Sequence, residues 1–183
     1  MYKRQSKDRD VESLCLNASI EDNISIAGMS EFAINNFLIL KNREKKYVNH
    51  QIEELSIKCA GRDQSVSQLS GGNKQKVVFG KWIGCGSEIL ILDCPTRGVD
   101  IGVKQAMYQL MVRLKNEGKS ILMISEELPE LIGMSDRILI MKNGEETSFI
   151  KSSSPLSLQA ASITVSSICL SRQILFLIVS LNK

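Results

Sequence analysis

The segment with the clearest chemistry is a serine followed by two glycines, Ser70, Gly71 and Gly72, at the start of a predicted helix. Short residues leave the first N–H groups of a helix unshielded, and the helix dipole adds partial positive charge at the same end. Both features favour an anion such as a phosphate group. Many turns contain Ser-Gly-Gly, so the segment gains its meaning from the elements that follow it.

An aspartate, Asp93, ends an apolar run that begins at Ile89. A second apolar run covers 120–124 and ends at Ser125. Such runs are typical of strands that are buried on both faces of a parallel sheet. A carboxylate at the carboxyl end of such a strand is well placed to hold a phosphate-bound Mg²⁺ ion, often through water.

Regular patterns around these residues predict the elements that position them. Apolar residues recur at helical spacing over 103–114, and Gly118 ends that helix. The two apolar runs and this helix therefore predict a strand, a crossover helix and a second, parallel strand. Further on, the run 138–141, the pair Asn143-Gly144 and a strand to about 150 predict a hairpin with a type I′ turn.

The N-terminal part is predicted to be mainly helical. Ser19 and Asp22 have the spacing of a capping box before a helix over about 20–28. A longer helical stretch is predicted over about 30–57, with the charged segment 41–46 on a solvated turn or helix face. Residues 1–18 are polar and show no clear period.

Composition excludes several classes of protein. The chain has 183 residues, of which 43% are hydrophobic and 23% charged, as in a soluble domain with an apolar core. The net charge is +3, and the first 150 residues carry equal numbers of acidic and basic side chains. A neutral body with few aromatic residues lacks the basic face and the stacking surfaces of a nucleic-acid binder. We therefore expect no nucleic-acid partner.

The cysteines and the histidine do not form a metal or disulfide pattern. The five cysteines are odd in number and lack C-x-x-C spacing, which argues against a disulfide framework and a zinc site. The single histidine, His50, lies in a polar stretch and is predicted to be solvated. The N-terminus leads into charged residues rather than an apolar segment, so no signal peptide is expected. These features favour the cytoplasm.

The last part of the chain, 151–183, has a different composition: it is rich in serine, has no acidic residue and ends in the apolar run Ile174–Val179. This run is too short to span a bilayer, which needs about 20 apolar residues. Two interpretations remain open, a degenerate tail and a C-terminal docking segment.

Taken in order, the motifs closely resemble those of the ATP-binding cassette family. The matching segments are the signature motif Leu69–Gln75, the Walker B strand Ile89–Asp93 with Cys94-Pro95-Thr96, the D-loop-like 97–100, the switch region 124–130 and the segment 135–138. Asn73 and the segment 95–100 resemble the second cassette of bacterial sugar importers of the ribose, galactose and xylose type. The resemblance covers roughly residues 7–150.

The resemblance implies an α/β fold, a partial P-loop NTPase cassette with a parallel sheet core and a helical subdomain, in which the strand and helix of the phosphate loop are missing. It implies a truncated nucleotide-binding domain over 1–150. Within this domain, a helical subdomain with the signature motif covers about 10–85, and the part from the Walker B strand to the hairpin covers about 86–150. The atypical tail then covers 151–183.

The resemblance also implies ATP and Mg²⁺ as cofactors. The residues that it places at the nucleotide are Ser70, Gly71, Gly72, Asn73 and Asp100, and the residue that it places at the metal is Asp93. The partners that it implies are an intact cassette and the membrane permease of a sugar importer, with the chain peripheral to the cytoplasmic face of the bacterial inner membrane and without a membrane span of its own.

Three departures from the family predict that the chain is inactive alone. No Gly-x-x-x-x-Gly-Lys-Ser/Thr sequence occurs, so the loop that cradles the nucleotide phosphates is missing. Cys94 stands where the family has a glutamate that activates water, and a mostly neutral thiol is a poor base. Glu126 stands where the family has its switch histidine. A nucleophilic role for Cys94 lacks a base and an orienting residue.

Three functions remain open at this point. The first is an ATP-binding component of a monosaccharide importer that contributes its signature motif to the ATP site of a partner. In that case, a bulky residue in place of Gly72 would block the approach of the phosphate to the signature motif. The second is a remnant with no nucleotide role. The third is a cassette ATPase that acts on nucleic acid or ribosomes, which the neutral body disfavours. Which sugar is carried does not follow from these residues.

Overall fold

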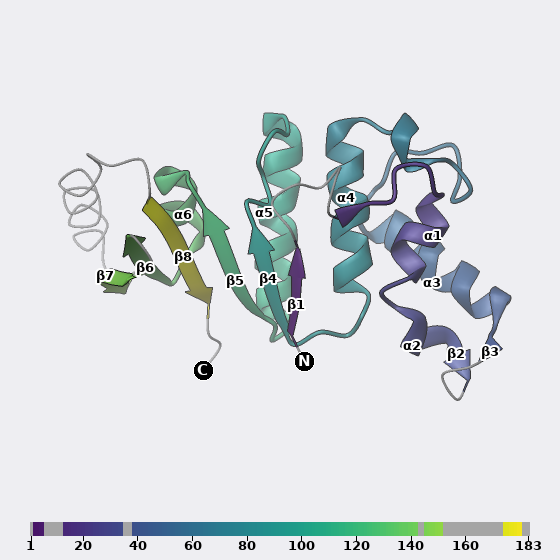
Figure 1. Cartoon of the computed structure of the whole chain (residues 1–183), viewed down its shortest axis with the longest axis horizontal. Coiled ribbons are helices and arrows are strands. Elements are labelled where there is room, and N and C mark those ends of the chain that lie inside the picture. The colour runs from purple at the N-terminus through teal and green to yellow at the C-terminus, as the bar shows by residue number, and fades with distance from the viewer. Residues whose placement is uncertain (1, 6–12, 35–37, 143–144, 152–173, 181–183) are drawn as a thin grey trace.

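The computed structural model describes residues 2–5, 13–34, 38–142, 145–151 and 174–180, and all that follows concerns these residues. They form one six-stranded sheet next to a mainly helical part (Figure 1). In the order of the sheet, the strands are β1 (Tyr2–Gln5), β4 (Ile89–Asp93), β5 (Ser120–Ser125), β8 (Ile174–Ser180), β6 (Arg137–Lys142) and β7 (Glu145–Lys151). A separate two-stranded sheet consists of β2 (Ala33–Ile34) and β3 (Leu38–Ile39).

The centre of the fold is the predicted strand, helix and parallel strand. β4 pairs with β5 in parallel, and the helix α5 (Ile101–Asn116) connects them. The predicted apolar positions of α5 pack inward, since Met107, Leu110 and Leu114 are buried. Gly118 follows the helix with a φ of +92°, a conformation that glycine adopts without the steric cost of a side chain. This part of the prediction is confirmed.

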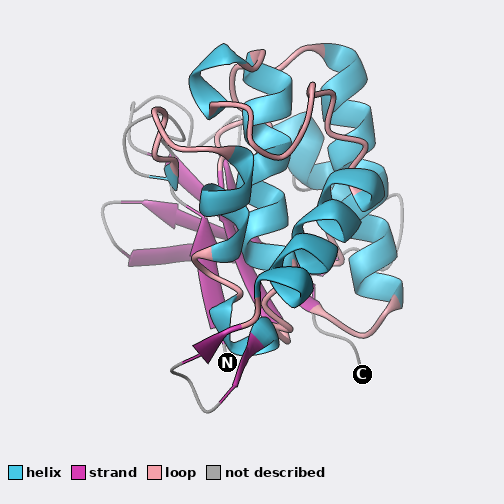
Figure 2. Ribbon diagram, turned by 90° about the vertical axis from the view of Figure 1, so that its right-hand side faces the viewer, coloured by secondary structure: helices cyan, strands magenta, loops and turns pink. Residues whose placement is uncertain are grey.

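The two central strands differ from the prediction in their burial. In β4, Leu90 and Leu92 are buried while Ile91 is only half-buried, and β5 shows the same alternation. The reason is visible in Figure 2, where the strands lie on one side and most of the helices on the other. Among the described residues, helices therefore cover one face of these strands more fully than the other.

The helical part is more broken than the sequence predicts. Its elements are α1 (Ile20–Ser25), α2 (Met29–Phe32), α3 (Lys41–Glu54), the 3₁₀ helix η2 (Val66–Gln68) and α4 (Gly71–Ile83). The expected helix over 30–57 is wrong, because the strands β2 and β3 interrupt it. The charged segment 41–46 does begin a largely exposed helix, as predicted.

Two local predictions in the helical part are confirmed. Ser19 Oγ accepts a hydrogen bond from the Asp22 N–H at 3.0 Å, and Asp22 Oδ2 accepts one from the Ser19 N–H at 3.2 Å, which is the expected capping box. His50 is solvated, with a side chain that is 70% exposed. One apolar core joins the helical part to the sheet, because Ile20, Ile24 and Val48 belong to the same cluster as the residues of β4 and α5.

Further strands complete the sheet. The predicted hairpin is present as the antiparallel pair β6 and β7, with a register shift between Ile140 and Met141, whereas the predicted turn at 143–144 lies outside the described residues. The strand β1, which was not predicted from the sequence, pairs in parallel with β4 through residues that show no apolar period. Within the described part of the chain, every helix falls short of the length and apolarity that a membrane crossing requires.

The helix α6 (Leu128–Met134) is tied to the sheet through one buried carboxylate, that of Glu130. Glu130 accepts hydrogen bonds from three hydroxyl groups, those of Thr96 after β4, Tyr108 on α5 (2.9 Å) and Ser125 at the end of β5 (2.5 Å). Burial, together with the neighbouring Glu130, raises the pKa of Tyr108 to about 12. The phenol therefore stays protonated and remains a donor at neutral pH.

Replacement of Glu130 by alanine is expected to lower the free energy of unfolding by about 2–4 kcal/mol, because three hydroxyl groups lose their acceptor. Glu130→Gln keeps one acceptor oxygen and is expected to lose less. Urea denaturation followed by circular dichroism measures both changes.

The matched control for this experiment is Glu53→Ala, at an exposed position of α3, which is expected to change stability by less than about 0.5 kcal/mol. Equal denaturation midpoints for Glu130→Ala and Glu53→Ala would contradict a structural role for the buried carboxylate.

Candidate functional site

The end of β4 and the end of β5 meet at one edge of the sheet. Asp93 stands opposite Ile124 in the parallel register, and the Cys94 N–H donates to the Ile124 carbonyl at 2.9 Å. Parallel strands present their carboxyl ends at the same edge, so Asp93, Cys94 and Ser125 come together there. This is the edge at which the sequence predicts a phosphate-bound metal.

A small cavity opens beside this edge. It has a volume of about 170 Å³ and is lined by Cys94, Thr96, Arg97, Ser125, Glu126 and Glu127. The structure thus brings together Cys94 and Glu126, the two residues that the sequence resemblance places at the positions of the family's glutamate and histidine. Their roles stay predictions. Ser125 and Thr96 bind Glu130 with their hydroxyl groups, so this wall of the cavity is held by the buried carboxylate.

Cys94 has an unusual backbone. It is buried, and its φ of +48° lies in the left-handed region, which side-chain-bearing residues rarely adopt. Such a conformation persists only where the surrounding structure holds it. Here the bond from the Cys94 N–H to Ile124 provides one restraint, and the Arg97 N–H donates back to the Cys94 carbonyl at 3.1 Å. The only histidine, His50, lies on α3 beside Glu54 rather than at this cavity.

The signature segment forms the N-terminus of α4. Ser70 is exposed and is the N-cap residue, whose Oγ accepts from the Asn73 backbone N–H at 3.4 Å and from the Asn73 amide at 3.0 Å. Asn73 in turn accepts a hydrogen bond from the Lys58 N–H at 2.9 Å through Oδ1. Ser70 and Asn73 therefore fix each other, and Asn73 joins the helix start to the loop before it.

Gly72 does not face outward as the sequence analysis supposed. It is buried, and a Cβ atom built on it would lie 2.6 Å from Cγ2 of Val103 on α5. A larger residue at Gly72 would displace Val103 and disturb the packing of α4 on α5. A bulky residue here would therefore disturb the fold in addition to any effect on a phosphate, and the role of Gly72 at a nucleotide stays a prediction.

Positive charge lies close to the signature segment. Lys76 is on α4 and donates to the Ser56 carbonyl at 2.8 Å. Burial lowers the pKa of the Lys76 amine, the nearby Lys58 lowers it further and Asp100 raises it. The start of α4 thus has the positive end of a helix dipole, and the Lys76 amine further along the helix interacts with both Lys58 and Asp100.

Asp100, predicted to bind the nucleotide, has a structural partner in this chain. It is the N-cap of α5, and its Oδ1 accepts a hydrogen bond from the Val103 N–H at 2.9 Å. The turn before it uses Gly98 with a φ of +66°. A hydrogen bond from the Gln75 amide to the Pro95 carbonyl, at 2.6 Å, ties this turn to α4. A direct hydrogen bond therefore joins the signature helix to the turn after β4.

The structure keeps the signature segment apart from the cavity at Cys94. None of the residues from Ser70 to Asn73 lines that cavity. The two groups of predicted site residues therefore do not form one site within the described part of this chain. The signature segment can act on an anion only if the rest of the phosphate site comes from elsewhere.

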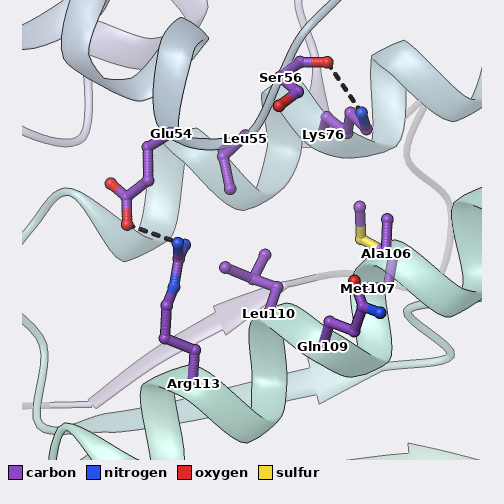
Figure 3. A pocket seen from close by; sticks show the side chains of 9 residues that line it. All are labelled: Glu54, Leu55, Ser56, Lys76, Ala106, Met107, Gln109, Leu110 and Arg113. Carbon is purple, nitrogen blue, oxygen red and sulfur yellow. Dashed lines mark hydrogen bonds and ion pairs between the residues drawn. The ribbon is translucent and has the colours of Figure 1, made fainter.

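A larger hollow that the sequence analysis missed lies between α3, α4 and α5 (Figure 3). It has a volume of about 270 Å³. Figure 3 shows an ion pair between Glu54 and Arg113, at 2.9 Å, on one side, and the bond from Lys76 to Ser56 on another. The ion pair of Glu54 with Arg113 crosses from α3 to α5, whereas Lys76 and Ser56 both lie on the side of the hollow away from α5.

The residues at the sheet edge fit the protein's share of a magnesium nucleotide site. Mg²⁺ binds through one or two carboxylates and completes its shell with water and substrate phosphates. Asp93 supplies one such carboxylate at the predicted place. Within the described residues no group of three or more His, Cys, Asp or Glu side chains is arranged to hold a metal by itself. The role of Asp93 at a nucleotide-bound Mg²⁺ ion stays a prediction.

One tripeptide, Gly118-Lys119-Ser120, matches the last residues of a phosphate loop but does not act as one. The residue five positions before Gly118 is Arg113 rather than glycine, and the segment leads from a helix into a strand instead of from a strand into a helix. Lys119 Nζ donates to the Ser87 carbonyl at 2.9 Å. Lys119 therefore stabilises the fold through this hydrogen bond.

Comparison with known proteins agrees with this geometry. The chain is 47% identical over 139 residues to the ribose import ATP-binding protein RbsA of Bacillus subtilis (strain 168), a match that covers 76% of this chain and 28% of that protein. The RbsA protein of Clostridium tetani is 42% identical over 139 residues, with the same coverage. The chain thus spans just over a quarter of the length of these curated relatives. No protein-family model matches the sequence.

Two solved cassettes have a similar fold. The ATP-binding cassette MJ0796, in a dimeric post-hydrolysis state with ADP and Pi, matches with a TM-score of 0.69 and 16% identity over 82% of this chain and 62% of that one. The ADP conformation of MJ1267, a cassette of an ABC transporter, matches with a TM-score of 0.69 and 19% identity over 93% and 68%. The predicted fold and resemblance are confirmed: the chain has part of an ATP-binding cassette fold, and its sequence is similar to a segment of ribose import ATP-binding proteins.

Proposed function

We propose that the chain is an ATP-binding component of a bacterial monosaccharide importer, in which its signature segment completes the ATP site of an intact cassette. The phosphate loop of that cassette holds the triphosphate, and the N-terminus of α4 approaches from the other side. The observation that carries the proposal is the exposed Ser70 cap at a helix N-terminus with Lys58 and Lys76 nearby.

The separation of the signature segment from the chain's own cavity supports an ATP site that is shared between this chain and a partner cassette. An ATP held at the partner's phosphate loop needs only the short, positively polarised end of α4 from this chain. The names of the relatives support the sugar importer, because they are ribose import ATP-binding proteins and are 41–47% identical over the matched region.

The chain's own contribution to hydrolysis is small in this proposal. A general base must lie beside a water molecule that faces the γ-phosphate, and Cys94 is a weak base at that position. No sequence among the 183 residues has the phosphate-loop pattern that would hold the triphosphate. If a partner supplies the phosphates at this edge, Asp93 would hold the Mg²⁺ ion, which neutralises charge on the phosphate oxygens.

The proposal also implies where in the cell the chain acts. A component of an importer works at the cytoplasmic face of the inner membrane, against a permease that carries the sugar. Specificity for one sugar then resides in the permease and the binding protein. The second candidate, a remnant with no nucleotide role, predicts no association that depends on ATP, so the experiment at Ser70 separates the two.

Ser70→Asp is expected to weaken ATP-dependent association with an intact cassette by more than about tenfold, because like charges about 4 Å apart repel by several kcal/mol. Aspartate also serves as an N-cap, so the start of α4 is kept. Sedimentation of the chain with an intact cassette of a ribose import ATP-binding protein, with and without ATP, measures the association.

The matched control is Ser70→Asn, which has nearly the shape of aspartate, caps a helix equally well and carries no charge. It is expected to retain most of the ATP-dependent association. If the wild type, Ser70→Asp and Ser70→Asn all associate to the same extent with and without ATP, the signature segment contributes nothing and the remnant interpretation stands.

The isolated chain is expected to hydrolyse ATP no faster than buffer, and Cys94→Glu alone is expected to leave this unchanged. A base acts only on water that is placed against a bound γ-phosphate, and this chain has no phosphate loop to place it. Phosphate release measured at saturating magnesium and ATP tests both statements. Turnover clearly above that of Cys94→Ala would reveal a phosphate site in this chain and refute the proposed dependence on a partner.

A further inference from the structure

The strand order of the main sheet contains a reversal at its centre. β5 and β6 follow each other along the chain through α6, yet they are not neighbours, because β8 lies between them (Figure 1). β8 pairs antiparallel with β5 over five residue pairs and antiparallel with β6 over five more. Ile178, for example, stands opposite Met123 on one side and opposite Ile138 on the other.

The two flanking strands define a slot for a single strand. Since β5 and β6 both run antiparallel to β8, they run parallel to each other, and β5 is also parallel to β4. Neighbouring strands lie about 4.8 Å apart, so β5 and β6 stand about 10 Å apart and admit one strand between them. Without an occupant, the facing edges of both strands would leave backbone N–H and C=O groups unpaired inside the sheet.

We infer that β8 is the built-in occupant of this slot and that it excludes any parallel strand from the same position. Its sequence suits the place, because the apolar run Ile174–Val179 is typical of a central strand, with polar residues rare in its interior. The pairing favours the docking segment over the degenerate tail as the interpretation of this part of the chain. The chain thereby closes its own sheet.

The exclusion has a consequence for nucleotide binding, and this step rests on the proposed function. A phosphate loop joins the carboxyl end of a parallel strand to a helix, and its loop must reach the edge at which Asp93 lies. The slot beside β5 is the interior position from which a strand would reach that edge. β8 runs in the opposite direction, so its presence keeps the sheet in a form that accepts no phosphate-loop strand.

A pair of engineered cysteines tests the occupancy of the slot. Leu139 and Leu177 stand opposite each other in the register of β6 and β8, and opposed residues in an antiparallel pair have the Cα separation that a disulfide needs. In the full chain with its native cysteines replaced, Leu139→Cys with Leu177→Cys is expected to oxidise to an intramolecular disulfide in most of the protein. Mass spectrometry of the digested protein identifies the bridge.

The matched control pairs Leu139→Cys with Phe176→Cys, one residue out of register. Strand alternation places these two thiols on opposite faces of the sheet, so little or no bridge is expected. Circular dichroism verifies that both variants keep the fold. Equal yields for the two pairs, or no bridge in either, would overturn the inference.

A peptide with the sequence of residues 174–180 tests whether β8 excludes another strand from the slot between β5 and β6. The peptide is flanked by lysines for solubility and labelled with biotin. The wild-type chain is expected not to capture it, because β8 fills the slot. Ile178→Pro removes a ladder N–H from the middle of β8, so that variant is expected to capture the peptide, while Ile178→Val is expected to behave as the wild type.

Capture by the wild type, or failure of Ile178→Pro to capture the peptide, would overturn the exclusive occupancy. Neither the cysteine pair nor the peptide involves ATP or a second cassette. If the Ser70 variants do not change ATP-dependent association, the proposed function is refuted and the assignment of β8 is unaffected. If the strand experiments fail, the assignment of β8 is refuted and the proposed function is unaffected.

Discussion

The parallel pairing of β4 with β5 is the constraint on which the rest of the structure depends. It brings Asp93 and Ser125 to one edge, and the hydrogen bond from Cys94 to Ile124 continues it one residue further. The carboxylate of Glu130 then stabilises this edge, because it accepts hydrogen bonds from Thr96, which follows β4, and from Ser125, which ends β5. A geometry of this kind needs a covered sheet, and α5 supplies the cover by burying Met107 and Leu114.

The same constraint explains why the signature segment is held so firmly yet lies apart from the cavity. α4 packs on α5 so closely that only glycine fits at residue 72 against Val103, and Gln75 binds the turn after β4. These contacts tie α4 to α5 and to the turn after β4, while residues Ser70 to Asn73 do not line the cavity at the sheet edge. Under the proposed function, the exposed Ser70 at the start of α4 is the part of this helix that would meet a partner cassette.

Several elements were predictable because their signals are local. The strands at 89–93 and 120–125, the helix between them and the capping box at Ser19 depend on patterns within a few residues. The helix expected over 30–57 was wrong because β2 and β3 depend on pairing with each other rather than on local periodicity. β1 was missed for a similar reason, since an edge strand pairs through its backbone and needs no apolar pattern.

By itself, the sequence determined the order of the motifs, the residue types at each of them and the presence of Cys94 directly after Asp93, because these are properties of short segments. Only the tertiary structure decided that Gly72 is buried against Val103, that Asp100 caps α5 and that β8 lies between β5 and β6. The physical reason is the same in each case. Steric contact and strand pairing join residues far apart in the chain, and no local pattern records which partner a side chain or a strand will meet.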